Sequence, residues 1–482
     1  MKNIPKINVS QRLKSENMWW CEPFQVPIRF SKHIPRPYLD IFYPRVIEKD
    51  IQRALVLMGP RRVGKTVLLH HAIKQLIETG VSPKNICYIS VDHPLYNGLD
   101  LEAFLEAYQE AVGVDYKNEA CFIFFDEIQY LKDWEVYLKR IVDSYRNIKC
   151  VVSGSSAAAL RLKSIESGAG RFSNFLLPPL TFYEYMILLG KMDLVHVHKS
   201  EQGFMQECVT DNMDELNQHF INYLNFGGYP EVALSPEIQK DPGQFVKSDI
   251  IDKVLLRDLP SLYGVKDIQE LNSLFTTLAY NTAQEVSLEQ LSKGSGVAKN
   301  TIKRYIEYLE AAFLIKTIHR VDRSARKFRK ANFYKVYLTN PSMRAALFNI
   351  ASDGDEAMGQ LVETAVFSQW FHTDALLHYA RWSGGEVDIV LLSPQQKAER
   401  AIEVKWSDRY VEHVDELKSL IQFCHDQNLG SAMVTSKSVK AIKRYKNVDL
   451  YFHPASLYCF MLGYNVIHRR SLLTGLAEID TK

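Results

Sequence analysis

A phosphate-binding loop lies between a predicted strand and a predicted helix near the start of the chain. Residues 55–69 read LVLMGPRRVGKTVLL, an apolar strand that runs into GPRRVGKT and then into an apolar helical stretch. This is the G-x-x-x-x-G-K-[ST] pattern in the strand-loop-helix setting that it requires. A glycine-rich turn that binds nothing is the alternative, and the agreement of all three segments argues against it. The chain is therefore predicted to bind a nucleoside triphosphate together with Mg²⁺.

Each residue type in this loop suits the binding of phosphate. Glycines let backbone N–H groups close around phosphate oxygens, and the helix that follows presents its positive N-terminal end. Lys65 is expected to reach the β- and γ-phosphate oxygens, and Thr66 to bind the metal ion. The predicted nucleotide-binding residues are Gly59, Pro60, Arg61, Arg62, Val63, Gly64, Lys65, Thr66 and Val67.

A second apolar run, residues 121–125, ends in Asp126 and Glu127. A continuous apolar run is typical of a strand buried on both faces of a parallel sheet, and the acidic pair at its end is a Walker B pattern. Asp126 is predicted to hold Mg²⁺ through water, and Glu127 to orient and polarise the attacking water. An acidic pair is by itself common as a solvated turn. With the loop upstream, it favours hydrolysis over transfer to a second substrate.

Strands and helices alternate through this region. This rhythm predicts an α/β fold with a parallel, doubly wound sheet. The expected strands and helices cover residues 86–92, 101–112, 134–148 and 150–156. Ser153 and Ser155, at the end of the last strand, would lie beside the Walker B strand and contact the γ-phosphate or the water as a sensor. A Ser-rich turn serves equally well as a helix N-cap, and both interpretations remain open.

Several further motifs add a family resemblance. They are VVSGSS, Gly170 to Phe172, residues 177–185 (LPPLTFYEY) and residues 226–231 (FGGYPE). Together with the loop and FIFFDEIQY, they make the chain resemble a large group of prokaryotic AAA-type ATPases, from about Leu55 to about Ala455. The resemblance implies an AAA-like ATPase core, a helical lid, a winged helix and a C-terminal domain of unknown function similar to PD-(D/E)xK nucleases. It implies no substrate.

With 482 residues the chain is long enough for about three domains. The first fifty residues are rich in Pro, aromatic residues and charge, and either pack onto the ATPase core or contact a neighbouring subunit. The expected divisions are an N-terminal extension (1–50), a P-loop ATPase core (51–185), a helical lid or linker (186–280), a winged helix (281–345), a nuclease-like domain (346–465) and a tail (466–482).

Oligomeric AAA-like proteins supply an arginine to the γ-phosphate, because positive charge stabilises the transferring phosphoryl group. The arginine comes from the lid or from a neighbouring subunit, so assembly into a homo-oligomer is part of this expectation. Arg171 and Arg257 are the candidates. An ordinary surface or ion-paired arginine is the commoner case.

The formal net charge of +2 gives no global signature of polyanion binding, so any nucleic-acid surface must be local. Seven cysteines without C-x-x-C pairs suit reduced core thiols and give no zinc site. The N-terminus has no apolar leader, and no segment approaches about 18 uninterrupted apolar residues. We therefore expect a cytoplasmic protein without a membrane partner.

Residues 286–315 predict a winged helix, with two short amphipathic helices, a Gly-containing turn and a following strand. Asn300 is a candidate cap for the second helix. Lys299, Lys303 and Arg304 would lie on the recognition helix, and the most basic run of the chain, residues 320–330, would form the wing. Contact with the phosphates of DNA or RNA is one interpretation. A protein-interaction module with a solvated basic run is the other.

The last domain carries a second possible chemistry. Three predicted strands, residues 375–379, 385–392 and 401–406, place Asp388, Glu403 and Lys405 in a D…E-x-K pattern. Residues two apart in a strand face the same side, so Glu403 and Lys405 are expected to point into one site.

Carboxylates there would hold Mg²⁺ and generate hydroxide near a scissile phosphate, while Lys405 orients water or stabilises the developing charge. By resemblance to PD-(D/E)xK folds, Glu363 would complete the ligand set of Asp388 and Glu403. The pattern predicts weak or gated nuclease activity with Mg²⁺ or Mn²⁺. The alternative is a buried salt bridge that organises the sheet of an inactive nuclease fold.

Three classes of function follow from these motifs. The first is an ATPase acting on or near nucleic acid, with the C-terminal domain cutting or gripping it. The second is a nucleotide-controlled switch whose winged helix and C-terminal domain bind protein partners. The third, a P-loop kinase of small molecules, is disfavoured because a kinase needs neither Glu127 nor a DNA-reader fold.

Overall fold

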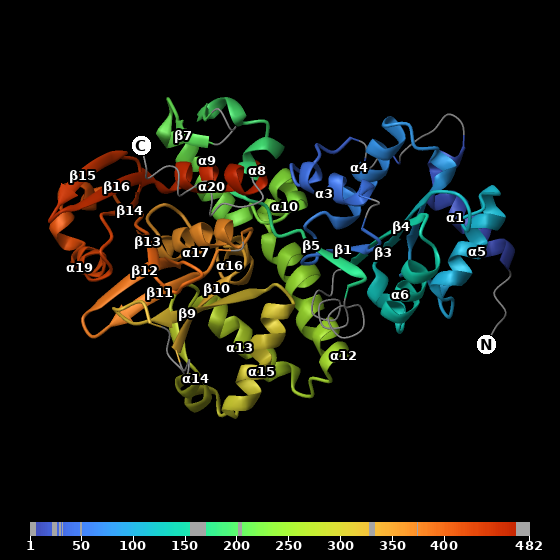
Figure 1. The fold of residues 1–482 in the computed structure, drawn as a ribbon. Coiled ribbons are helices and arrows are strands. Elements are labelled where there is room, and N and C mark those ends of the chain that lie inside the picture. Colours follow the sequence, from blue (N-terminus) through green and yellow to red (C-terminus); the bar gives the residue numbers. More distant parts are fainter. Residues whose placement is uncertain are drawn as a thin grey trace. The chain divides into compact units, whose positions relative to one another are not determined.

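The computed structural model describes residues 6–21, 27, 30, 32–48, 51–154, 170–200, 205–326, 333–373 and 375–468. The chain divides into two units, Met1–Pro178 and Pro179–Lys482, which are drawn in Figure 1. Each unit has its own large sheet.

The first unit is built on a parallel sheet, as the sequence predicts. Within the described residues the strand order is β2-β3-β4-β1-β5, and all neighbouring strands run parallel (Figure 1). Every residue of β1 and β3 is buried, which explains their uninterrupted apolar runs. The strands are β1 (Ala54–Met58), β2 (Ile86–Ser90), β3 (Cys121–Asp126), β4 (Ile148–Gly154) and β5 (Phe172–Leu176). The predicted α/β class is confirmed.

The longer helices of this unit are α1 (Lys6–Glu16), α3 (Leu39–Ile47), α4 (Lys65–Glu78), α5 (Leu101–Val112) and α6 (Trp134–Ser144). Helix α5 has the predicted bounds: Asp100 accepts a hydrogen bond from the Ala103 N–H at its start, and Gly113 is left-handed at its end. The predicted helix 134–148 is too long. Helix α6 stops at Ser144, because Ile148 already pairs with Cys121 in the sheet.

The N-terminal extension packs on the edge strand β2. Asn17 donates to the Tyr88 carbonyl at 2.8 Å and accepts from the Tyr88 N–H at 2.6 Å, as a neighbouring strand would. The indole N–H groups of Trp19 and Trp20 both donate to the Ile86 carbonyl. Of the two alternatives left open by the sequence, these described residues follow the first, and they cover an edge that would otherwise be unpaired.

The second unit begins with helices. They are α8 (Phe182–Leu188), α9 (Met213–Phe226), α10 (Pro230–Leu234), α11 (Pro236–Lys240), the π-helices η6 (Gly243–Asp252) and η7 (Val254–Asp258), α12 (Leu259–Tyr263) and α13 (Ile268–Tyr280). A two-stranded ladder of β6 (His196–Lys199) and β7 (Met205–Val209) follows α8. The FGGYPE segment lies at the turn between α9 and α10, as its glycines and proline predict.

The remaining strands of the second unit form a single nine-stranded sheet within the described residues, in the order β15-β16-β14-β13-β12-β11-β9-β10-β8. They are β8 (Glu285–Ser287), β9 (Ile315–Val321), β10 (Phe333–Leu338), β11 (Leu377–Trp382), β12 (Gly385–Leu392), β13 (Ala398–Glu403), β14 (Ser431–Ser436), β15 (Ala441–Tyr445) and β16 (Val448–Pro454). Strand β11 pairs in parallel with β9, so the predicted domains 281–345 and 346–465 share this sheet.

The helices along this sheet are α14 (Leu288–Ser295), α15 (Lys299–Ala311), α16 (Ser342–Leu347), α17 (Met358–Trp370), α18 (Arg409–Glu412), α19 (Lys418–Gln427) and α20 (Ala455–His468). Ala298, not Asn300, is the N-cap of α15, and no side chain caps this helix, so the predicted cap is wrong. Strand β13 ends at Glu403, which leaves Lys405 beyond the strand in which it was predicted.

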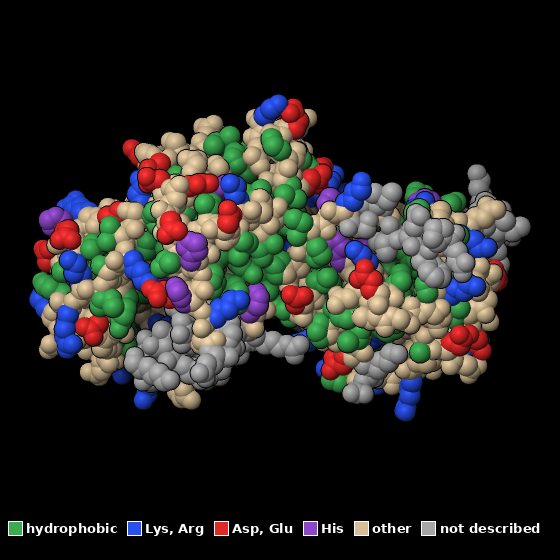
Figure 2. Space-filling view, turned by 90° about the horizontal axis from the view of Figure 1, so that it is seen from above, with side chains coloured by type: hydrophobic (Ala, Val, Ile, Leu, Met, Phe, Trp, Pro, Cys, Tyr) green, Lys and Arg blue, Asp and Glu red, His purple; other side chains and the backbone are tan. Residues whose placement is uncertain are grey.

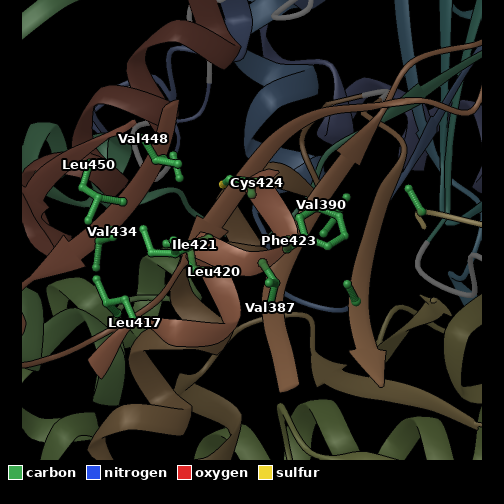
Figure 3. Close-up of a cluster of buried hydrophobic side chains, with 14 of the residues drawn as sticks. Val387, Val390, Leu417, Leu420, Ile421, Phe423, Cys424, Val434, Val448 and Leu450 are labelled. Carbon is green, nitrogen blue, oxygen red and sulfur yellow. The ribbon is translucent and has the colours of Figure 1, made fainter. Parts of the chain in front are cut away.

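Helix α19 packs on one face of the nine-stranded sheet. Its buried side chains Leu420, Ile421, Phe423 and Cys424 meet apolar residues from β12, β14 and β16 in a core cluster (Figure 3). This apolar layer holds one face of the strands that carry Asp388 and Glu403.

Charge is mixed over the face of the molecule that Figure 2 shows. On the face shown in Figure 2, Lys and Arg side chains are interspersed with Asp and Glu side chains, in keeping with the net charge of +2. Among the helices of the described residues, none has both the length and the apolar character needed to cross a membrane.

Candidate functional site

The phosphate-binding loop has the strained backbone that its pattern requires. Gly64, the N-cap of α4, has a φ of 93°, and Arg62 has a φ of 127°. A Cβ atom at Gly59 would lie 2.2 Å from the Leu177 carbonyl oxygen, so only glycine fits there. Backbone strain of this kind is typical of ligand-binding loops.

Lys65 is folded into the loop. Its side chain is buried, and its ammonium donates to the carbonyl oxygens of Gly59 at 3.0 Å and Pro60 at 2.7 Å. The loop therefore holds a positive charge at the first turn of α4, where the helix dipole adds to it.

Asp126 is the centre of the polar contacts beside this loop. Its Oδ2 accepts a hydrogen bond from Thr66 Oγ1 at 2.7 Å and another from Tyr88 Oη at 2.8 Å. Its Oδ1 accepts from Ser153 Oγ. Burial, together with the Asp126 carboxylate, raises the pKa of Tyr88 well above its usual value, so Tyr88 stays a donor. Three hydroxyl groups from separate elements thus converge on one carboxylate.

The strand order explains this convergence. Strand β4 lies between β1, which leads into the loop, and β3, which ends in Asp126. Ser153 pairs with Leu57 in the register of β4 and β1, and the carboxyl ends of parallel strands meet at one edge of the sheet. The structure thereby brings Ser153 to Asp126, while Ser155 lies outside the described residues.

Glu127 directly follows this carboxylate in a strained conformation. Its φ is 57°, which is rare for a residue other than glycine. Its N–H lies 3.4 Å from Ser153 Oγ, and its Oε2 accepts a hydrogen bond from the Gln129 side chain. Gln129 is a contact that the sequence analysis did not foresee. Strain at this position is a physical reason to look for function there.

A second polar cluster lies in the nine-stranded sheet. At Asp388 the pairing of β11 with β12 shifts register between His378 and Ala380, so two residues, Asp388 and Ile389, stand opposite Tyr379. Val387 and Val390 both belong to the core cluster although they are three apart, which regular alternation forbids. This bulge leaves Asp388 off the apolar face, a common use of bulges near polar sites.

Lys335 of β10 lies among the carboxylates of this cluster. Its ammonium is 2.9 Å from Glu363 Oε1, 2.7 Å from Glu386 Oε1 and 3.4 Å from Asp388 Oδ1, and its side chain is 3% exposed. Tyr337, two residues along β10, donates to Glu363 Oε1 at 2.7 Å. The sequence analysis missed Lys335, since it lies in a different predicted domain from its partners.

Lys405 reaches the same cluster from beyond the end of β13. Its ammonium is 2.7 Å from Glu403 Oε1 and 3.8 Å from Asp388 Oδ2. The Thr435 hydroxyl holds its backbone by accepting from the Lys405 N–H and donating to the Lys405 carbonyl. Asp388, Glu403, Lys405 and Glu363 are therefore brought together as predicted, although strand alternation is not what places Lys405.

The buried charges perturb one another. Burial, with the Asp388 charge, raises the pKa of Glu403 to about 7, and burial raises the pKa of Glu363 to about 7. Burial acts to raise the pKa of Asp388, but the charges of Lys335 and Lys405, together with the hydrogen bonds from Lys335 and the Val404 N–H, hold this pKa below its usual value. Asp388 is thus the charged centre of the cluster.

The carboxylate cluster does not have the form of a metal site. Within the described residues, no group of three or more His, Cys, Asp or Glu side chains is placed to hold a metal ion. Lys335 lies between Glu363 and Asp388, the residues predicted as ligands with Glu403. The predicted ligand set therefore does not fit a divalent ion in this arrangement.

Comparison with known proteins identifies the first region. Residues 51–186 match a family model described as an AAA domain. The chain contains an AAA domain. Residues 217–354, outside this domain, match a model described as a domain of unknown function.

Two relatives that match most of the chain are named as uncharacterized proteins. An uncharacterized protein of Methanocaldococcus jannaschii is 26% identical over 393 residues, which cover 76% of this chain and 79% of that protein. One from Haemophilus influenzae is 25% identical over 395 residues, 81% of this chain and 90% of that protein. A solved structure of Cdc6p from Pyrobaculum aerophilum is 12% identical and covers 69% of this chain and 96% of its own, with a TM-score of 0.27.

The AAA domain offers a donor set that fits Mg²⁺. Thr66 supplies a hydroxyl oxygen and Asp126 a carboxylate, and hard oxygen ligands of this kind are what Mg²⁺ prefers beside phosphates. These two residues would hold the ion, while Lys65 and the loop N–H groups would hold the phosphates.

The two candidate finger arginines, Arg171 and Arg257, lie in different units. Arg171 donates to Asp143 at 3.0 Å, and its carbonyl accepts from the Ala54 N–H at the start of β1. It therefore lies at the opposite end of the sheet from the loop and is not brought to Lys65 of its own chain. The other candidate, Arg257, lies in η7 of the second unit.

Arg36 is a functional candidate that sequence reasoning missed. It is buried and donates to the carbonyl oxygens of Val63, inside the loop, at 2.7 Å and of Pro178 at 3.1 Å. It therefore supports the loop from the N-terminal extension. No motif marks it, and its only sequence signal is a charged residue in an aromatic, proline-rich segment.

Proposed function

We propose that this chain is an Mg²⁺-dependent ATPase that acts on or near nucleic acid. The observation that carries the hydrolytic part is the Asp126 carboxylate, which Thr66 and Ser153 share, directly before the strained Glu127. In this assignment Lys65 binds the β- and γ-phosphates, and Glu127 orients the attacking water and accepts its proton. Ser153 responds to the γ-phosphate through Asp126. Mg²⁺, when bound, neutralises phosphate charge.

The nucleic-acid part rests on the second unit. The order α13, β8, α14, α15, β9, β10 agrees with the order expected of a winged helix, and it supports the proposal that α15 is the recognition helix. Lys299, Lys303 and Arg304 are exposed on α15, where they are available to phosphates. In the predicted wing, residues 327–330 lie outside the described residues.

The C-terminal part of this proposal is a gripping role for the nuclease-like region. Asp388, Glu403 and Lys405 meet in a D…E-x-K arrangement on a mixed sheet, which supports descent from a nuclease fold. The poor fit to a divalent ion favours binding over cleavage, since phosphodiester hydrolysis by such sites depends on a metal-activated water.

A nucleotide-controlled switch that binds protein partners is the second candidate. One observation favours it: the lysines of α15 have carboxylate neighbours, with Lys299 at 3.8 Å from Glu289 and Lys303 at 3.9 Å from Glu307. Arg323 of the predicted wing is likewise paired with Asp426. Exposed pairs of this kind are weak, so phosphate groups can displace them, but they make the face less basic than its sequence.

We further propose that copies of the chain assemble, because Arg171 lies at the other end of the sheet from the phosphate-binding loop of its own chain. Arg171 or Arg257 of a neighbouring copy would supply it. Turnover per chain should then rise with protein concentration.

The rate of ATP turnover, measured with and without DNA or RNA across a salt series, tests the proposal. Stimulation that falls as salt rises supports action on nucleic acid, because counterion release weakens phosphate contacts at high salt. Turnover unchanged by any polynucleotide at low salt supports the switch. No turnover at all would contradict both candidates.

A further inference from the structure

A buried ammonium group stands in the carboxylate cluster of the second unit. Lys335 is 3% exposed, and three carboxylates, those of Glu363, Glu386 and Asp388, lie within 3.4 Å of its Nζ atom. A buried lysine of this kind retains its charge only when opposite charges surround it closely. These three carboxylates, despite burial, raise the pKa of Lys335 well above its usual value.

The oxygen atoms that would bind a metal ion already have partners. Asp388 Oδ1 faces Lys335, and its Oδ2 accepts from the Val404 N–H at 2.9 Å, with Lys405 at 3.8 Å. Glu363 Oε1 accepts from both Lys335 and Tyr337. A divalent ion would have to displace donors from two carboxylates at once.

Glu403 is the exception in this cluster. Within the described residues its Oε2 is buried without a hydrogen-bond partner, which alone would suggest an additional cation. One carboxylate oxygen is too few for Mg²⁺ or Mn²⁺, which bind through several oxygen ligands. Lys405 already lies 2.7 Å from the other oxygen, Oε1, so the Glu403 carboxylate has a cationic partner without a metal ion.

The charges around Asp388 also disfavour a divalent ion. Two ammonium groups, those of Lys335 and Lys405, lie within 4 Å of Asp388. A divalent ion placed there would be repelled by both at short range, where charge interactions in a protein interior are strong. Lys335 already supplies the positive charge that the carboxylates need.

We propose that Lys335 takes the place of a divalent cation in this cluster, so that the second unit holds these carboxylates together without a metal ion. The inference goes beyond the proposed function, since it holds whether the second unit binds nucleic acid or protein. It also explains why this nuclease-like site would not cut a phosphodiester: the Lys335 ammonium fills the position that a metal ion would need.

Mn²⁺ alone, without nucleotide, is the probe that tests this inference in the full-length chain. After treatment with EDTA, the free Mn²⁺ is measured by electron paramagnetic resonance in the wild type, in Lys335→Ala and in Lys335→Ala/Asp388→Asn. We expect no uptake by the wild type beyond that of Asp388→Asn. Lys335→Ala opens space and removes the repelling charge, so it should bind Mn²⁺ about tenfold more tightly or better, and the double variant should lose this gain.

Lys418→Ala, which removes an exposed lysine from α19 of the same unit, is the matched control and should not gain Mn²⁺ binding. Two results would overturn the inference. One is Mn²⁺ uptake by the wild type that Asp388→Asn abolishes. The other is a Lys335→Ala variant that is folded by circular dichroism and binds no more Mn²⁺ than the wild type. If Lys335→Ala does not fold, the comparison of wild type with Asp388→Asn decides alone.

Discussion

Thr66 Oγ1 donates a 2.7 Å hydrogen bond to Asp126 Oδ2, across 60 residues of sequence. The bond joins the first turn of α4 to the end of β3 at the edge of the sheet where the phosphate-binding loop lies. Thr66 belongs to the phosphate-binding loop and Asp126 to the Walker B pattern, and both motifs are recognisable in the sequence. The hydrogen bond between them joins the two motifs in one site.

Lys65→Ala should weaken ATP binding strongly. Removing a charged donor from a phosphate is expected to cost about 1.5–3 kcal/mol, or roughly 10- to 150-fold in Kd. Titration with a fluorescent ATP analogue measures this loss. Lys74→Ala, at a half-buried position of the same helix, is the matched control and should bind as the wild type does. Equal affinity in both variants would contradict the assignment of Lys65.

Glu127→Gln should retain ATP binding and stall hydrolysis. The amide cannot accept a proton from the attacking water, and the loss of a positioned base is expected to slow turnover by about 10²–10⁴-fold. Phosphate release under single-turnover conditions measures the rate, and Glu106→Gln on the exposed side of α5 serves as control. Wild-type turnover in Glu127→Gln would make the catalytic assignment wrong.

Neutralising the basic run should flatten the salt dependence of any nucleic-acid binding. The variant changes Arg323, Arg326, Lys327, Arg329 and Lys330 together. If all five contact DNA phosphates, the slope of log K against log salt should shrink by up to about 4–5. Arg323 should contribute less to this change in slope than the other four residues, because it is already paired with Asp426. Fluorescence anisotropy over a salt series measures the slope.

The control for this variant neutralises Lys443 and Arg444 on β15, outside the predicted winged helix. It should leave the slope as it is. If binding is unchanged after the five substitutions, the contact lies elsewhere or the protein-switch candidate gains support.

Asp388→Ala should destabilise the second unit, because it leaves Lys335 and Lys405 short of a partner in a buried cluster. Breaking a buried ion pair by removing one side is expected to cost about 3–5 kcal/mol. Asp449→Ala, which removes a more exposed partner of Arg444, should cost about 1 kcal/mol or less. Urea unfolding compares the two, and ATP turnover should persist in both.

No cleavage of DNA or RNA by the wild type is expected with ATP, with its analogues or without nucleotide. Cleavage in the presence of Mn²⁺ that disappears in Lys405→Ala would instead restore the nuclease that the D…E-x-K pattern predicts. That outcome would leave the ATPase assignment untouched, since the two sites lie in separate units.

His453 should make the second unit less stable in acid. Burial, followed by the nearby Lys440, lowers the pKa of His453 from 6.5 to about 4, although Glu207 acts in the opposite direction. The unfolded chain binds this proton more readily, so the free energy of unfolding should fall by about 3 kcal/mol from pH 6.5 to pH 4. His453→Gln should remove this part of the slope in urea unfolding at several pH values. An identical slope in both proteins would show that His453 does not titrate as expected.

Local patterns in the sequence were sufficient for much of the AAA domain. The apolar runs of β1 and β3, the glycines of the loop and the caps of α5 determine conformation through neighbours a few residues away. For the same reason, the spacing of the motifs alone predicts Lys65, Thr66 and Asp126 as site residues. Asp388, Glu403 and Lys405 were likewise recognised from an alternating pattern.

Tertiary structure decided which distant residues complete each site. Arg36, Tyr88 and Lys335 carry no motif, because their roles depend on contacts with elements far along the chain. The bulge at Asp388 depends on pairing between β11 and β12, and helix α6 is shorter than its periodicity predicts because Ile148 joins a strand. Sheet pairing and burial act between segments, so local sequence could place the carboxylates of the second cluster but not the lysine that lies among them.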